Sequence, residues 1–199
     1  TAVFMARFCP EKIYKPLKSA VNLMAGIPSV VYGFFGLVVL VPFVRTHIGG
    51  FGMGVLTASV LLGLMILPTI ISVSESAIRA VPESYYEGSL GLGASHERSV
   101  FFAVLPAAKS GILAGIVLGI GRAIGETMAV LMVTGNAAVI PTSFFEPVRT
   151  IPATIAAELG EAPAGGAHYQ ALFMLGAVLF LITLGLSIAV EYISSKRKI

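Results

Sequence analysis

Arg122 and Glu126 are the residues whose types and spacing most clearly suggest chemistry in this sequence. They lie four residues apart in the apolar stretch 110–134, so one continuous helix would place both side chains on the same face. A guanidinium attracts anions, and a nearby carboxylate would neutralise it or tune the positive field that an anion meets. Two interpretations stay open here. The pair is a charged part of a translocation path, to which Thr127 would also belong, or it is an ion pair that fixes helix packing without touching a substrate.

The residues around this pair have the composition of a membrane protein. Of the 199 residues, 56% are hydrophobic and only 12% are charged, whereas soluble domains carry about 25% charged residues. A soluble helical protein with a large core would have shorter apolar runs, interrupted by polar faces. The net charge of +3 is too small to indicate a nucleic-acid partner. Composition therefore favours an all-α, polytopic helix bundle in a lipid bilayer, with one domain over residues 1–199.

Apolar runs long enough to cross a bilayer divide the chain. An α-helix needs about 20 apolar residues to span the hydrocarbon core. The expected segments are 1–8, as the end of a truncated helix, and complete spans at 19–44, 53–74, 110–134 and 169–193. We therefore expect the sequence to be the C-terminal part of a longer protein. Pro28 interrupts backbone hydrogen bonding within the span 19–44 and predicts a helix kink there.

The charged pair lies deep in its span and shares a side of it with small residues. Arg122 follows Lys109 by 13 residues, which is about 20 Å along a helix in a hydrocarbon core about 30 Å thick. A lone arginine there costs at least about 2.5–3.5 kcal/mol. Gly111, Gly115 and Gly119 fall on the same side as the pair, and glycines let a second helix approach closely. We expect the pair to point into a helix bundle or a cavity, not into lipid.

The distribution of lysine and arginine predicts the orientation of the spans. Alternating loops place ten of the 13 basic residues on one side, two on the other and one, Arg122, within a span. The ten are Arg7, Lys12, Lys15, Lys18, Arg79, Arg98, Lys109, Lys196, Arg197 and Lys198, and the two are Arg45 and Arg149. Basic loops stay in the cytoplasm. The segment 82–106 and the C-terminus are therefore expected in the cytoplasm, and the loop 136–167 outside.

The cytoplasmic segment 82–106 has the pattern of a short helical hairpin. Pro82 suits the start of a helix, Gly93 suits a turn, and Ser95 suits the N-cap of a second helix. Apolar side chains interrupt its polar residues, as in elements that dock into a groove on a partner. The alternative is an ordinary amphipathic loop at the membrane surface.

This segment resembles the "EAA" loop of ABC-importer permeases. Glu87, Gly93, Leu105 and Pro106 stand at the spacing of that motif, whereas Gly88 and Ser89 replace its two alanines and Ala103 replaces its isoleucine. Two longer stretches, 26–36 (GIPSVVYGFFG) and 121–130 (GRAIGETMAV), are more specific. They resemble the permeases of phosphate importers, and PstC-like more than PstA-like subunits because of residues 127–130. The stretch 150–158 (TIPATIAAE) fits the same subunit.

The resemblance implies a fold and a set of partners. The fold would be that of type I ABC-importer permeases, the MetI-like class. The chain would pair with a PstA-like permease, receive phosphate from a PstS-like binding protein, and contact a PstB-like ATPase dimer. The residues implied in ATPase coupling are Glu87, Gly88, Ser89, Gly93, Leu105 and Pro106. Those implied in transport are Arg122 and Glu126. The membrane would be a bacterial or archaeal plasma membrane, the inner membrane in a Gram-negative cell.

Several activities are not expected of this chain itself. It has no glycine-rich phosphate loop ending in Lys-Ser or Lys-Thr, so ATP and magnesium would bind to the partner ATPase and no catalytic residue is expected here. The three histidines are scattered and do not have metal-ligand spacing. Two alternatives remain for the function. One is a permease for another oxyanion, such as sulfate or molybdate, and the other is a secondary transporter or transmembrane interaction subunit without an ATPase.

Overall fold

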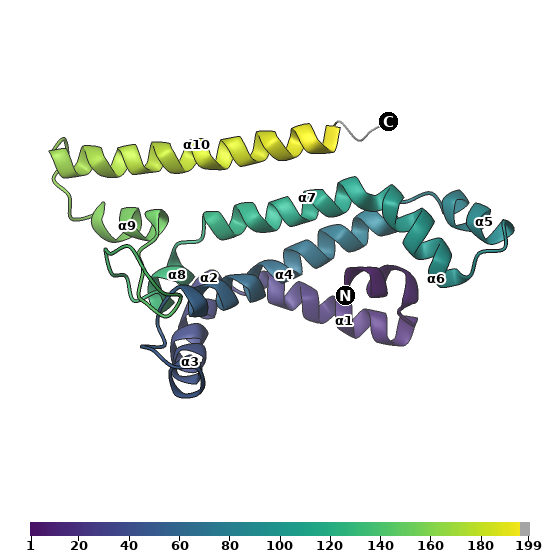
Figure 1. Cartoon of the computed structure of the whole chain (residues 1–199), viewed down its shortest axis with the longest axis horizontal. Coiled ribbons are helices and arrows are strands. Elements are labelled where there is room, and N and C mark those ends of the chain that lie inside the picture. Colours follow the sequence, from purple (N-terminus) through teal and green to yellow (C-terminus); the bar gives the residue numbers. More distant parts are fainter. Residues whose placement is uncertain (196–199) are drawn as a thin grey trace. The chain divides into compact units, whose positions relative to one another are not determined.

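The computed structural model describes residues 1–195, with side chains described as far as Ile188, and these residues are mainly helical (Figure 1). The α-helices are α1 (Glu11–Gly26), α2 (Ser29–Phe35), α3 (Val41–His47), α4 (Val55–Arg79), α5 (Glu83–Gly91), α6 (His96–Ser99), α7 (Leu105–Ile124), α8 (Met128–Val133), α9 (Ile151–Glu158) and α10 (Ala167–Ser195). Three π-helical turns are η1 (Phe4–Phe8), η2 (Gly36–Leu40) and η3 (Val100–Val104). Residues 1–195 contain no strand, only an isolated bridge between Gly135 and Val148. The all-α prediction is therefore confirmed.

Within the described residues, four helical segments are long and apolar enough to cross a membrane. They are Ser29–His47, Val55–Arg79, His96–Ile124 and Ala167–Ile188. The count agrees with the four complete spans expected from the sequence, but two of the spans differ clearly in their bounds. The expected span 19–44 is divided before Ser29, and the expected span 110–134 begins at His96 and ends at Ile124. The basic cluster at 196–198 lies outside the described residues.

The first difference is a break in the helix at Pro28. Pro28 has an extended backbone with φ −60° and ψ 141° and directly precedes α2. Proline lacks an N–H and disfavours helical conformation in the residue before it, so α1 ends at Gly26. The sequence predicted a kink within one span and no helix before residue 19 other than the segment 1–8. In the structure, α1 instead begins at Glu11. Its apolar residues recur with the period of a helix and its basic residues lie between them, so the segment forms an amphipathic helix.

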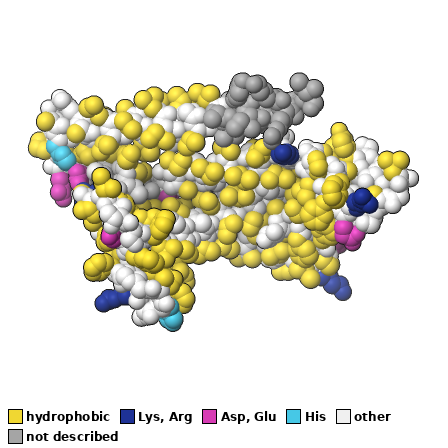
Figure 2. All heavy atoms as spheres, in the orientation of Figure 1, with side chains coloured by type: hydrophobic (Ala, Val, Ile, Leu, Met, Phe, Trp, Pro, Cys, Tyr) yellow, Lys and Arg dark blue, Asp and Glu magenta, His cyan; other side chains and the backbone are white. Residues whose placement is uncertain are grey.

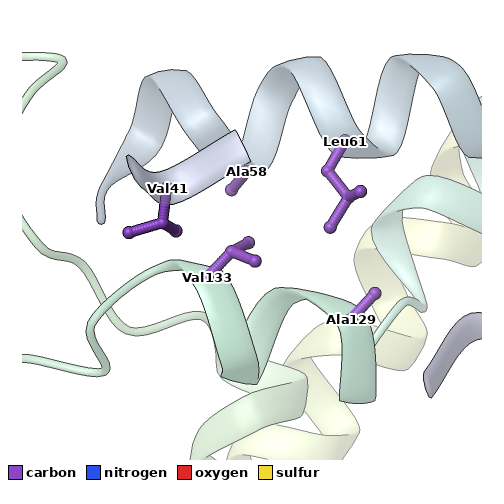
Figure 3. Packing of buried hydrophobic residues seen from close by; sticks show 5 residues of the cluster. All are labelled: Val41, Ala58, Leu61, Ala129 and Val133. Carbon is purple, nitrogen blue, oxygen red and sulfur yellow. The ribbon is translucent and has the colours of Figure 1, made fainter. Parts of the chain in front are cut away.

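The chain forms two compact units, one built mainly from residues 1–26 and 67–120 and the other from 27–66 and 121–187. The core of the first contains Ile78, Val81, Val104 and Ala108, with residues of η1 packed against it. The core of the second contains Val41, Ala58, Leu61, Ala129 and Val133 (Figure 3). Each core therefore joins segments that are far apart in sequence.

Small residues allow this close packing within the second unit. A Cβ atom on Gly33 of α2 would lie 2.8 Å from the Cα atom of Ala129 in α8, and one on Gly36 would lie 2.9 Å from a methyl group of Val133. The backbone of α2 and η2 therefore lies directly against α8, which no larger residue would permit.

Large hydrophobic side chains cover much of the surface. Figure 2 shows one face on which hydrophobic side chains predominate and charged ones are few. Leu118 of α7 is 57% exposed, and Phe173, Met174 and Phe180 of α10 are 58%, 70% and 62% exposed. Apolar exposure of this extent is expected where lipid or another subunit, not water, surrounds a helix.

Candidate functional site

The two charged residues of the third span do not lie on one continuous helix. Arg122 belongs to the last turn of α7, which ends at Ile124, and Glu126 follows the helix end. The backbone N–H of Gly125 still donates to Gly121, 3.2 Å away, but that of Glu126 donates to Ala123 at 3.3 Å, so the helical pattern is lost there. The expectation that Arg122 and Glu126 share a helix face was therefore wrong. Gly125, a residue of low helix propensity, is the first residue after the helix.

Glu126 instead interacts with the start of the next helix. One carboxylate oxygen, Oε1, accepts a hydrogen bond of 3.1 Å from the backbone N–H of Ala129 in α8. The first N–H groups of a helix have no intrahelical partner, and a carboxylate near them is further favoured by the helix dipole. Glu126 is partly buried, whereas Arg122 is exposed on the isolated chain.

Thr127 lies beside an open groove of about 520 Å³. The groove is lined by Gly125 and Thr127 from the break between α7 and α8, Pro152, Ile155, Ala156, Leu159 and Gly160 from α9 and its end, and Leu179 from α10. The hydroxyl of Thr127 donates to the carbonyl oxygen of Gly125 at 3.2 Å. Gly125 and Thr127 therefore bring to this groove backbone that directly follows the end of the span at Ile124 and lies outside a regular helix.

The glycine repeat of α7 lies against α4, as expected from the sequence. A Cβ atom on Gly115 would lie 3.2 Å from the hydroxyl oxygen of Ser74 and from Cβ of Val73. A Cβ atom on Gly111 would overlap the side chain of Ala77. Gly119 is buried. The prediction of a close neighbouring helix along this side is confirmed, and that neighbour is α4.

The segment 82–106 forms the expected helical hairpin in its first half. Pro82 precedes α5, Gly93 has a φ of +83°, and the Ser95 hydroxyl accepts a bond of 3.4 Å from the N–H of Arg98. A positive φ is unfavourable for residues with a side chain, so the turn requires glycine at position 93. The second half differs from the expectation, because α6, η3 and α7 continue without a break through Leu105 and Pro106. The wide turn η3 precedes Pro106, which cannot donate a backbone hydrogen bond.

Most residues of the EAA-like motif are accessible on this hairpin. Glu87 and Gly88 of α5 are exposed, Ser89 is half-buried, and Gly93 at the turn is exposed. Leu92, at the end of the hairpin, is 91% exposed. The exposed side chains and backbone of the hairpin are therefore accessible for contact with a partner. Leu105 and Pro106 are the first two residues of α7, which follows the hairpin in the sequence.

The sequence interpretation missed a buried carboxylate near the end of α4. Glu75 is 1% exposed and accepts hydrogen bonds from Tyr14 (2.7 Å), Lys18 (2.6 Å) and Arg79 (2.8 Å). The bond to this carboxylate raises the pKa of Tyr14. Burial of a carboxylate requires such partners. The available signal was the charged pair Glu75 and Arg79, four residues apart at the end of an apolar run.

A second missed contact joins the N-terminal residues to the hairpin. The Nη1 atom of Arg7 lies 3.0 Å from Oε2 and 3.3 Å from Oε1 of Glu83, in the first turn of α5. The Arg7 guanidinium also lies over the ring of Tyr86, 5.8 Å from its centroid. No local sequence pattern relates residues 76 positions apart, so this contact could not be found from spacing.

The loop 136–167 contains one short helix, α9, and its own ion pairs. Arg149 and Glu158 form an ion pair, and Nε2 of His168 lies 3.1 Å from Oε2 of Glu158. Arg149 also donates to the carbonyl oxygen of Asn136 at 3.1 Å. These contacts connect the last residue of α9, Glu158, to Arg149 before the helix and to His168 at the start of α10.

Comparison with known proteins identifies relatives over the whole chain. A permease from Bacillus subtilis, described as "Probable ABC transporter permease protein YqgH", is 39% identical over 199 residues, which is 100% of this chain and 64% of the relative. The "Phosphate transport system permease protein PstC" of Mesorhizobium japonicum is 39% identical over 92% of this chain and 62% of the relative. That of Pasteurella multocida is 38% identical over the same shares. The chain thus spans less than two thirds of the length of these relatives.

Solved structures show the same fold. A chain of the MetNI methionine ABC transporter, in inward-facing conformations, aligns with a TM-score of 0.74 and 20% identity over 98% of this chain and 83% of its own. A chain of a bacterial ABC transporter that imports alginate aligns with a TM-score of 0.67 and 15% identity over 100% of this chain and 71% of its own. The expected MetI-like fold of ABC-importer permeases is therefore confirmed. The model of one protein family matches residues 1–199, and the chain belongs to that family, the binding-protein-dependent transport system inner membrane components.

Proposed function

We propose that this chain is a permease subunit of an ATP-driven importer of inorganic phosphate and forms half of its translocation path. The observation that carries the proposal is identity of 36–39% to permeases named for phosphate transport, over 92% of this chain. The fold supports it, because the described part of the chain has four helices long and apolar enough to span a membrane and a hairpin between two of them. The chain itself would not hydrolyse ATP.

The proposed assembly is the one that the resemblance to phosphate-importer permeases implies. A PstA-like permease would supply the other half of the path, and a PstS-like protein would deliver phosphate from outside. A PstB-like ATPase dimer, which binds ATP and magnesium, would contact the hairpin through Glu87, Gly88, Ser89 and Gly93, with Leu105 and Pro106 behind them. The membrane is a plasma membrane, with the hairpin and the C-terminus in the cytoplasm.

The proposed path includes Arg122, Glu126 and Thr127. The break in the helix after Ile124 exposes backbone and hydroxyl groups at the groove beside Thr127. Arg122 supplies the positive charge that attracts phosphate, and Glu126 shapes the break by holding the start of α8. The break at Pro28 gives the neighbouring span a point at which it can bend.

Phosphate uptake tests this function. Full-length protein with its partners is placed in vesicles, and ATP-driven uptake is compared between wild type and Arg122→Gln at equal assembly. We expect uptake to be lost and assembly to stay intact. Unchanged uptake would remove Arg122 from the transport mechanism. Uptake of sulfate or molybdate in preference to phosphate by the wild type would contradict the substrate and favour another oxyanion.

Association with the ATPase tests the coupling role. We expect Glu87→Arg, which reverses an exposed charge on α5, to abolish copurification of the ATPase. Retained ATPase would contradict the docking surface. Uptake without any ATPase would instead favour a secondary transporter.

A further inference from the structure

The N-terminal turn η1 contacts both helices of the hairpin, α5 and α6, and the turn η3 that follows them. Arg7 pairs with Glu83 of α5, and the ring of Phe8 lies edge-on to that of His96 in α6, with centroids 4.9 Å apart. Phe8 also contacts Phe101 of η3, at a centroid distance of 6.2 Å. The two helices of the hairpin are themselves joined by a 2.7 Å hydrogen bond between Tyr86 and His96. A movement of α5 therefore acts on η1 directly.

The same turn is connected to α4. Met5 is 1% exposed, and its backbone carbonyl oxygen accepts a 2.8 Å hydrogen bond from Nη2 of Arg79. The Nε atom of Arg79 donates to Glu75, so one guanidinium joins η1 to the buried carboxylate. The Arg79 guanidinium also lies 4.5 Å from the centroid of the Tyr14 ring in α1.

Glu75 then connects α4 to α1. Its two carboxylate oxygens accept hydrogen bonds from Tyr14 and Lys18, which lie one helical turn apart on α1. The side chain of Glu75 is 2% exposed and that of Lys18 is 28% exposed. Charge-assisted bonds to a buried group are stronger than those at an exposed surface and hold a fixed geometry. The contacts thus form one chain from Glu83 through Arg7, Met5, Arg79 and Glu75 to Tyr14 and Lys18.

We infer that this chain of contacts is a relay that transmits displacement of the hairpin to α1, the helix that ends just before the break at Pro28. The inference rests on the proposed function, because it requires an ATPase that moves the hairpin. Arg7 and Glu75 act as positioning residues in it. The side chain of Arg7 is only 13% exposed, which restricts its motion, and it pairs with the more exposed side chain of Glu83, which is 56% exposed. Rigid, mutually bonded elements of this kind carry coupling between distant sites.

The test separates a relay from a contact that only stabilises the fold. The full transporter in vesicles is prepared as wild type, as Arg7→Glu, as Glu83→Arg and as the double variant that exchanges the charges. The quantity measured is phosphate taken up per ATP hydrolysed. We expect each single variant to retain the ATPase at the wild-type ratio but to lower uptake per ATP by about fivefold or more. The double variant should recover most of the wild-type value. Lys12→Glu, a charge reversal at an exposed position of α1 that belongs to neither the hairpin nor the relay, is the control and should have the wild-type value.

Each outcome bears on one claim. Wild-type uptake per ATP in both single variants would overturn the relay, and so would single variants that lower only the amount of folded protein. Loss of uptake per ATP that the charge exchange does not restore would also overturn it. A wild-type complex that binds no ATPase would contradict the proposed function instead. The relay and the function therefore fail in distinguishable ways.

Discussion

At the scale of single residues, Glu126 follows the end of α7 and accepts a hydrogen bond at the start of α8. Helical spacing predicts that Arg122 and Glu126 share a face, but this holds only while the helix continues. Gly125 allows α7 to end between them, and Glu126 then accepts a hydrogen bond from Ala129. The carboxylate of Glu126 therefore has two properties, a negative charge and an oxygen that accepts the bond from Ala129. A substitution can remove the charge and keep the acceptor oxygen.

Glu126→Gln and Glu126→Ala should have different effects for this reason. Glutamine keeps an acceptor oxygen for the Ala129 N–H, whereas alanine removes it, at a cost typical of a lost helix cap, about 1 kcal/mol. If the backbone contact is the main role, phosphate uptake should survive in the glutamine variant and fall in the alanine variant. Uptake assays at equal expression measure this. Equal loss in both variants would show that the negative charge itself is required.

Glu75→Gln should destabilise the chain. The substitution keeps the shape but removes the charge that Lys18 and Arg79 share, and a hydrogen bond involving a charged group contributes about 2 kcal/mol. We expect a lower melting temperature of the purified transporter in detergent. Glu11→Gln, at an exposed position of α1, is the control and should melt as the wild type does. An unchanged melting temperature in Glu75→Gln would mean that the buried charge contributes no net stability.

At the scale of elements, the sequence predicted those features that depend on the backbone preferences of single residues. Pro82, Gly93 and Ser95 each have a backbone preference, and the structure places them at the helix start, the turn and the N-cap of the hairpin. The four apolar segments were also found, because length and hydropathy suffice for that. The path from Glu75 to α1 and from Arg7 to Glu83 could not be found, since it depends on which distant segments pack together. The helix end after Ile124 was missed because an isolated glycine is tolerated within helices.

The contact between α7 and α4 gives a prediction at this scale. Gly115→Leu adds a side chain where a Cβ atom would already lie 3.2 Å from Val73 and Ser74, so the two helices must separate. Overpacking of this kind costs about 1–3 kcal/mol. We expect phosphate uptake to fall more than expression. Gly63→Leu, on α4 where no atom lies within 4 Å of an added Cβ, is the control. Normal uptake at normal expression in Gly115→Leu would show that the contact is not tight.

At the scale of the whole molecule, the charge distribution predicts the orientation in the membrane. The expected alternation of the spans assigns ten basic residues to the side of the hairpin, three of them at 196–198 outside the described residues, and two to the side of the loop 136–167. Moving the hairpin outward would bring most of these charges across the membrane, against the strong tendency of basic loops to remain inside. The orientation also determines the rest of the proposal, since an ATPase can reach the hairpin only from the cytoplasm.

Cysteine labelling measures this orientation, and the single native cysteine makes the background simple. In a Cys9→Ser chain, Glu97→Cys marks the hairpin and Ser143→Cys marks the loop, both at exposed positions. In intact cells, a maleimide that cannot cross membranes should label position 143 only. In inside-out vesicles it should label position 97 only. Because α7 separates the two positions, labelling of both from one side would mean that His96–Ile124 does not span the membrane. The reverse pattern would mean that the basic side faces outward, which would leave the hairpin out of reach of any cytoplasmic ATPase.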